Sequence, residues 1–306
     1  MSSLIEQAAQ RMEQLRQAGA DMPAMPPVAS AVDAVKNPVI EAQSISLSRR
    51  VEINLDALSA VGIVSPNSPR SQIADQFRVI KRPLISNAMG KGASVIVNGN
   101  LIMVTSALPG EGKSFTAINL AMSIATELDN TVLLVDADVA SPSVMKMLGL
   151  PDSPGLLDLV LDESTDMSSM LLKTNIDKLT ILPSGTPHTR ATELLASDAM
   201  IRLLDEMARR YTDRIVVFDS PPLLLTTEAR VLATHMGQVV VVVQAERTLQ
   251  SEVRHALATI EACPVKLMLL NQARAVSKGV YGYGGYNFGY GADMSSGKPG
   301  SPQHQF

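Results

Sequence analysis

The sequence is poor in the residues that mark several classes of protein. It has one cysteine and no tryptophan, and aromatic residues make up only 3% of its 306 residues. A single cysteine, Cys263, excludes disulfides within the chain and is typical of a reducing cytoplasm. No apolar run approaches the roughly 20 residues of a membrane-spanning helix, since the longest candidate, Val239 to Val243, is strand-sized. The first residues also lack the basic and then apolar pattern of a secretory signal.

Positive charge is scarce as well. The 26 Lys and Arg residues are outnumbered by 30 Asp and Glu residues, which gives a formal net charge of −4 at pH 7. Because no basic stripe stands out, the sequence argues against nucleic acid as a partner. With 46% hydrophobic and 18% charged residues, the composition is that of a soluble globular protein. The length allows one large domain with extensions.

A glycine-rich stretch, Ser-Ala-Leu-Pro-Gly-Glu-Gly-Lys-Ser at 106–114, separates an apolar run from a helical pattern. A strand, such a turn and a helix opening on Gly-Lys-Ser form the context of a phosphate-binding loop, although Ala107 replaces the usual first glycine. Backbone N–H groups and the helix dipole would hold a triphosphate, Lys113 would reach its β- and γ-phosphates, and the Ser114 hydroxyl would ligate Mg²⁺. The residues expected to bind ATP here are Pro109, Gly110, Glu111, Gly112, Lys113, Ser114 and Phe115.

Between Asn98 and Asn271, strand-like and helix-like segments alternate. The strand-like runs are nearly continuous in Val, Ile and Leu, as expected for strands covered by helices on both faces. Right-handed crossovers then give an α/β fold, a parallel doubly wound sheet of the P-loop NTPase type that binds ligands at its carboxyl edge. We expect strands at 101–105, 131–135, 179–182, 214–218, 238–243 and 265–270, and helices at 71–82, 114–127, 192–210 and 249–262.

Polar residues end three of these strands. Asp136 and Asp138 follow one strand, Asp219 follows another, and Asn271 ends the last. A single acid at a strand end is commonly a turn or cap residue. Two acidic strand ends beside a phosphate-binding loop favour a site that ligates Mg²⁺ or orients an attacking group. Asn271 either contacts the base of the nucleotide or forms a turn.

The two ends of the chain differ from this middle. Residues 1–70 are expected to form an N-terminal helix and a flexible linker, residues 71–275 the P-loop domain, and residues 276–306 a disordered tail rich in Gly and Tyr. The tail is either a low-complexity segment without chemistry or a set of hydroxyl nucleophiles attached to a triphosphate site. Four of the chain's five tyrosines lie in it, at Tyr281, Tyr283, Tyr286 and Tyr290.

One further group of charges lies on the expected helix 71–82, which Pro83 would end or kink. Asp75, Arg78 and Lys81 recur there every three residues. Spacing alone favours a solvated face with one Asp–Arg pair worth a few tenths of a kcal/mol.

Together these motifs resemble those of the bacterial tyrosine autokinases of polysaccharide synthesis and export, and more narrowly their exosortase-associated branch. The resemblance covers about residues 70–290. It rests on the motifs at 107–114, 135–138 and 218–222, on Leu-Pro-Ser-Gly at 182–185 with Glu-Leu-Leu at 193–195, and on the tyrosine cluster.

The resemblance implies an ATP- and Mg²⁺-dependent protein-tyrosine autokinase that regulates exopolysaccharide polymerisation and export. It implies that Asp136 accepts the tyrosine proton and that Ser114, Asp138 and Asp219 hold Mg²⁺. A ring-shaped homo-oligomer, in which each tail is phosphorylated by a neighbour, would assemble through Asp75, Arg78 and Lys81. A separate membrane-spanning chain-length regulator would activate this cytoplasmic chain at the inner membrane. The implied catalytic residues are Lys113, Asp136, Asp138 and Asp219.

The chain departs from the family pattern in places. Asp75 stands for the usual Glu, and Lys81 stands for the usual second Arg, which removes a planar bidentate donor. Ser141 precedes a proline where relatives often carry Arg. One alternative is a partitioning-type ATPase switch of the Min and Par class, but its signature lysine is replaced here by Leu108. The other is an idle, nucleotide-binding scaffold subunit of a polysaccharide export complex, against which the intact lysine and acids argue.

Overall fold

The computed structural model describes residues 49–66, 71–210 and 213–273. All of them belong to one compact unit, Ser46–Phe306. The N-terminal helix expected at residues 2–18 and the tyrosine tail lie outside the described residues. Within the described ranges, no helix has the length and apolar character needed to cross a membrane.

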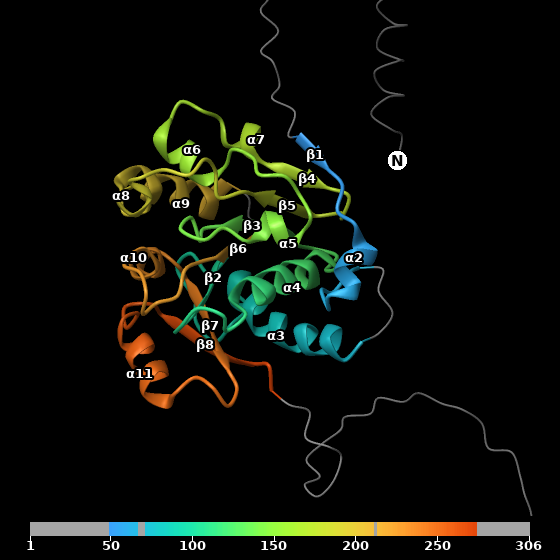
Figure 1. Cartoon of the computed structure of the whole chain (residues 1–306), viewed down its shortest axis with the longest axis vertical. Helices are drawn as coiled ribbons and strands as arrows, with labels where there is room; N and C mark the ends of the chain where they lie inside the picture. The colour runs from blue at the N-terminus through green and yellow to red at the C-terminus, as the bar shows by residue number, and fades with distance from the viewer. Residues whose placement is uncertain (1–48, 67–70, 211–212, 274–306) are drawn as a thin grey trace, which may run out of the picture. The chain divides into compact units, whose positions relative to one another are not determined.

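The described strands form a single sheet. They are β1 (Arg49–Val51), β2 (Leu101–Ser106), β3 (Thr131–Asp136), β4 (Leu172–Thr174), β5 (Leu179–Leu182), β6 (Arg214–Asp219), β7 (Gln238–Gln244) and β8 (Val265–Asn271). Their order is β1-β4-β5-β3-β6-β2-β7-β8 (Figure 1). Every neighbouring pair is parallel except β4 and β5. The predicted doubly wound fold is confirmed, with one short antiparallel step near its edge.

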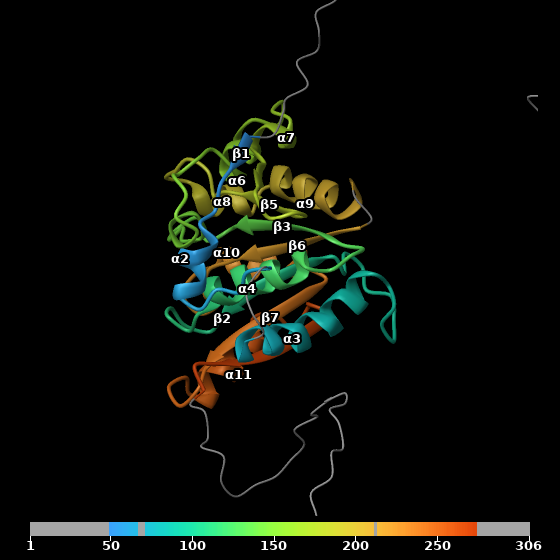
Figure 2. The same ribbon diagram turned by 90° about the vertical axis from the view of Figure 1, so that its right-hand side faces the viewer.

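Helices pack on both faces of the sheet. Leu101 and Met103 of β2 are buried in one apolar cluster, and Ile102 and Val104 in the other, because successive strand residues point to opposite faces. Figures 1 and 2 show α3 and α4 side by side on the second face. The helices are α2 (Leu55–Ala60), α3 (Gln72–Ala88), α4 (Lys113–Ala125), α5 (Val144–Met147), α6 (Leu156–Leu161), α7 (Met167–Met170), α8 (Ala191–Leu195), α9 (Asp198–Arg210), α10 (Glu228–Thr234) and α11 (Gln250–Ala258).

The predicted strands are all present, and five of the six end one residue later than expected. Two predicted helices differ more from the structure in where they begin or end. The helix expected at 192–210 is divided into α8 and α9, since the Ser197 hydroxyl accepts the Met200 N–H and starts a new helix. Pro83 lies inside α3, which continues to Ala88. The fully buried Leu84 holds this second half of α3 against the sheet.

The fold also includes residues N-terminal to position 71, where the domain was expected to begin. β1 pairs with β4. Ile53, Leu58 and Ile63 are buried in the same cluster as α4. The Val64 N–H donates to the Asn119 side chain of α4 at 2.7 Å. Residues 49–66 are therefore part of the sheet and its apolar layer.

Candidate active site

Residues 107–112 form the loop between β2 and α4. Gly110 and Gly112 have φ angles of +82° and +92°, a region that favours glycine. A Cβ on Gly112 would lie 2.2 Å from Nδ2 of Asn271, so a larger residue does not fit there. Gly112 is the N-cap residue of α4, and because it has no side chain it forms no capping hydrogen bond to the first N–H groups of the helix. The first N–H groups of α4 are therefore left for an anionic ligand.

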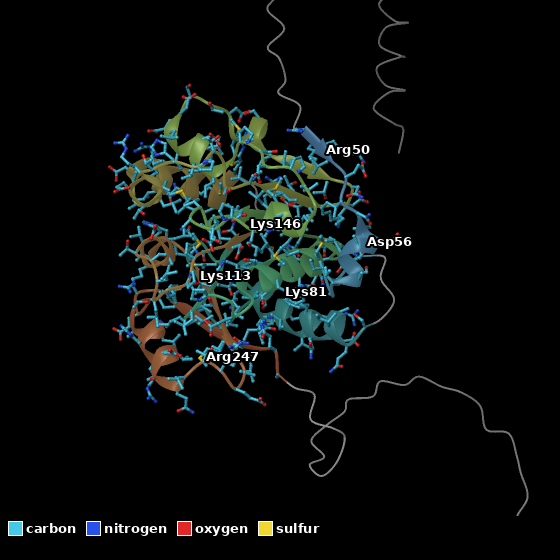
Figure 3. The ribbon with its side chains drawn as sticks, in the orientation of Figure 1. Arg50, Asp56, Lys81, Lys113, Lys146 and Arg247 are labelled. Carbon is cyan, nitrogen blue, oxygen red and sulfur yellow. The ribbon has the colours of Figure 1, made fainter. Side chains whose placement is uncertain are left out.

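The structure brings the predicted lysine and acids together at the carboxyl edge of the sheet. Lys113 Nζ lies 2.5 Å from Asp138 Oδ2 and 3.9 Å from Asp219 Oδ1. Asp136 and Asp219 are register partners on the neighbouring strands β3 and β6. Figure 3 labels Lys113 at the start of α4. Two strand ends and the start of α4 thus supply one polar cluster.

Only one of the two carboxylate oxygens of Asp136 accepts hydrogen bonds in the described structure. Its Oδ2 accepts the N–H groups of Ser143 at 3.1 Å and Val144 at 3.0 Å, which close the segment after β3. Its Oδ1 is buried and has no hydrogen-bond partner among the described residues. Burial raises the pKa of Asp136 to about 6, although the two N–H groups oppose the change. Asp136 therefore has one oxygen left for a ligand or a proton.

Ser143 is a site residue that the sequence reasoning missed. Its hydroxyl donates to the Ser114 hydroxyl at 2.8 Å, while its N–H holds Asp136. It therefore joins the phosphate-binding loop to the acidic motif. The only signal was its place seven residues after Asp136, in a segment with no helical or strand period.

Asp219 is the most confined group of the cluster. Its side chain is fully buried, and neither carboxylate oxygen has a hydrogen-bond partner among the described residues. Burial raises the pKa of Asp219 to about 7, against the opposing charge of Lys113. A buried carboxylate without hydrogen-bond donors is costly, and Lys113, at 3.9 Å, is its ion-pair partner in the described structure.

The donor set fits Mg²⁺. Carboxylate and hydroxyl oxygens are the ligands that this ion prefers, and neither oxygen of the buried Asp219 has a hydrogen-bond partner among the described residues. In the described part of the chain, no group of three or more His, Cys, Asp or Glu residues could hold a metal ion alone. Mg²⁺ would therefore share the site with phosphate oxygens, as it usually does in phosphoryl-transfer enzymes.

The remaining residues expected at the nucleotide lie around the loop. Pro109 and Gly110 are exposed at its tip, and Glu111 is buried. Asn271 Nδ2 donates to the Glu111 carbonyl at 2.9 Å, so its described contact is with the loop backbone. Phe115 and Asn271 line a groove of about 680 Å³ whose walls are otherwise mainly apolar residues of α3 and β8.

The three residues expected to mediate assembly do not lie in one environment. Arg78 donates to Asp75 at 2.5 Å, and both side chains are about half exposed. Lys81 is 3% exposed and pairs with Glu127 at 2.6 Å. Its Nζ also donates to the Ser123 carbonyl at 2.5 Å. Lys81, labelled in Figure 3, therefore fastens α3 to the end of α4.

Fold and site together define a P-loop nucleotide-binding protein. Residues 99–271 match the family described as AAA domain. Tyrosine-protein kinase YwqD of Bacillus subtilis is 32% identical over 225 residues, which cover 73% of this chain and 91% of YwqD. The chain belongs to the AAA domain family and, within it, to the bacterial tyrosine-protein kinases.

Two further comparisons agree with this family. The succinoglycan biosynthesis transport protein ExoP of Rhizobium meliloti is 34% identical over 194 residues, or 62% of this chain and 23% of ExoP. The crystal structure of the chimerical protein CapA2B2 superposes with a TM-score of 0.57 at 30% identity, over 72% of this chain and 93% of that one. Membership of the narrower exosortase-associated branch stays a prediction.

Proposed function

We propose that this chain is an ATP- and Mg²⁺-dependent protein-tyrosine autokinase that acts in exopolysaccharide production. The observation that carries the proposal is the convergence of Lys113 with three acids, two of which keep buried oxygens unpaired. The family suggests that tyrosine accepts the phosphoryl group, because the relative YwqD is named a tyrosine-protein kinase. ExoP, by its name, links a relative to polysaccharide biosynthesis and transport.

Each residue of the cluster has a distinct task in this reaction. Bound MgATP supplies an activated γ-phosphoryl group, whose transfer spreads negative charge over its oxygens. Lys113 would exchange its ion pair with Asp138 for the β- and γ-phosphates. Ser114, Asp138 and Asp219 would hold the metal. Phe115 and Asn271 would line the nucleotide's side of the groove.

Asp136 would take the proton. When a tyrosine oxygen bonds to the γ-phosphorus, the bond from that phosphorus to the β–γ bridging oxygen breaks and the phenolic proton must leave. The unpaired Oδ1 of Asp136 is a suitable acceptor, and its pKa of about 6 lies in the range of an effective general base.

We further propose that the acceptors are Tyr281, Tyr283, Tyr286 and Tyr290 of a neighbouring copy in a ring-type homo-oligomer. The Asp75–Arg78 pair on α3 is the exposed part of the expected assembly motif, since Lys81 is buried. A separate membrane-spanning chain-length regulator would activate the kinase and hold it at the inner membrane from the cytoplasmic side. No residue of the described site favours the alternative function, a partitioning-type ATPase switch.

The test is to incubate the full-length chain with Mg²⁺ and labelled ATP and to map the labelled residues. Label should appear on the four tail tyrosines and be absent from Lys113→Met. Transfer between copies is tested by mixing Lys113→Met, which keeps the tyrosines, with a variant in which all four tyrosines are Phe. Label on the Lys113→Met chain supports transfer in trans. Label that persists in Lys113→Met alone, or that avoids tyrosine, contradicts the proposal.

A further inference from the structure

Glu111 places a carboxylate inside the phosphate-binding loop, where a negative charge opposes the binding of a triphosphate. Its side chain is buried, with 2% of the residue exposed. Oε2 accepts the Leu108 N–H at 2.6 Å, within the loop itself. Oε1 accepts the N–H of Gln244, the last residue of β7, at 3.3 Å and the hydroxyl of Thr248, in the turn between β7 and α11. The carboxylate therefore bridges two segments of the chain.

The chemistry of these partners explains why the residue is acidic. All three are donors, and an ionised carboxylate accepts through both of its oxygens. Glutamine has the same shape but carries an NH₂ group in place of one oxygen. Whichever way its amide turned, that NH₂ would face the N–H of Leu108 or the donors of the turn. With its oxygen turned to Leu108, glutamine removes the acceptor of the Gln244 N–H and reverses the bond to Thr248, whose hydroxyl, already accepting the Gln244 N–H at 3.3 Å, would have to accept the NH₂ instead of donating. With its oxygen turned to Gln244 and Thr248, it leaves the Leu108 N–H without its acceptor.

The backbone of Glu111 is held as well. Asn271 Nδ2 donates to its carbonyl at 2.9 Å, and the next residue, Gly112, has no room for a side chain against Asn271. Within the turn, the Thr248 N–H donates to the Gln244 carbonyl at 3.2 Å. The loop is fixed on the ends of β7 and β8 by side-chain and main-chain contacts of a single residue.

We propose that Glu111 is a positioning residue, which with Thr248 fixes the phosphate-binding loop on the β7–α11 turn in the shape that receives nucleotide. The proposal rests on the proposed function only in taking this loop as the nucleotide site. It predicts that acceptor geometry matters more at position 111 than charge does. A neutral glutamine removes the repulsion of the phosphates yet should weaken binding, because it cannot accept from Leu108 and from Gln244 and Thr248 together.

The test measures the affinity of the full-length chain for a fluorescent ADP analogue with Mg²⁺. Glu111→Gln and Thr248→Val should each weaken binding about ten-fold, the usual effect of losing one buried hydrogen bond to a charged group. Thr248→Ser keeps the hydroxyl and should bind as the wild type does. The matched control is Thr259→Val, since that hydroxyl donates only to the Ala256 carbonyl at the end of α11. In autophosphorylation by Thr248→Val, KM for ATP should rise more than kcat falls.

Tighter binding by Glu111→Gln would show that the charge dominates and would overturn the proposal. Equal affinities for Thr248→Val and Thr259→Val would overturn it too. Thermal unfolding checks that each variant is folded, and the Thr248 series decides the matter if Glu111→Gln is not. Failure of the wild type to bind the nucleotide would instead contradict the proposed function.

Discussion

Asp219 is buried without a hydrogen-bond partner in the described structure, and its ion pair with Lys113 spans 3.9 Å, an arrangement that lowers stability when the carboxylate is ionised. Its pKa is raised from 3.8 to about 7. Between these values the folded chain keeps a proton that the unfolded chain has released. Stability attributable to this group is therefore complete below pH 4, falls as the pH rises and is lowest above pH 7.

Asp219→Asn should accordingly stabilise the metal-free, nucleotide-free protein at pH 8. The expected gain is of the order of 4 kcal/mol, or several degrees in Tm, and it should vanish towards pH 4. Thermal unfolding from pH 4 to pH 8, with EDTA present, measures it. Asp138→Asn is the comparison, because Asp138 is paired with Lys113. A gain that does not depend on pH would show that titration of Asp219 is not its cause.

Asp136→Asn tests the proton acceptor. Asparagine keeps the shape, and its oxygen can still accept the N–H groups of Ser143 and Val144, so the fold should survive. Loss of a general base typically slows turnover 10²- to 10⁴-fold. Autophosphorylation rates at saturating MgATP, with thermal melts alongside, check both parts. A near-normal rate would assign the proton to another group.

At the scale of elements, α3 carries charged residues in two different environments, although their spacing is regular. Arg78 makes an exposed pair, whereas Lys81 is buried against the end of α4. Lys81→Ala should cost roughly 2 kcal/mol, the value of hydrogen bonds to a charged group. Arg82→Ala, an exposed neighbour on the same helix, should change stability little. Denaturant titrations distinguish the two, and equal midpoints would contradict the anchoring role.

Arg78→Ala should leave stability within about 0.5 kcal/mol of the wild type, because its pair is exposed. It should nevertheless lower the oligomer mass and the transfer between copies if α3 mediates assembly. Light scattering, with Arg82→Ala as the control, measures the mass. An unchanged mass would leave Asp75 and Arg78 as a solvated pair.

The strands, the site residues and α3 show how far the sequence could predict the structure. Continuous Val and Leu runs located the six strands to within one residue, because only buried strands carry them. The acids at 136, 138 and 219 could be placed at one edge since parallel strands end together. The burial of Lys81 and the contact of Ser143 with Ser114 depend on how α3 and the segment after β3 pack, which no local pattern encodes. β1 and β4, at three residues each, are too short to show a period.

For the whole molecule, charge links the reaction to assembly. Each phosphotyrosine adds about −1.5 to −2 charges, so four would add roughly −6 to −8. The entire chain now carries −4. Phosphorylated tails gathered in one oligomer would repel one another and the acids of the site. The unphosphorylated protein should therefore form the larger assembly, and phosphorylation by added ATP should cause that assembly to dissociate.

Native mass measurement before and after MgATP tests this expectation, and raised salt should weaken the effect by screening. The control is the variant with Phe at Tyr281, Tyr283, Tyr286 and Tyr290. Break-up of that variant by ATP to the same extent as the wild type would show that the tail charge is not responsible.

The contacts that shape the phosphate-binding loop span most of the described chain. Glu111 is separated by 137 residues from Thr248 and by 160 from Asn271. During translation the loop is made before both of these anchors, and Asn271 is among the last described residues to be made. A nascent chain that stops short of Asn271 therefore lacks part of the support of this loop. Nearly the whole domain must therefore be synthesised before the phosphate-binding loop can make all of its contacts.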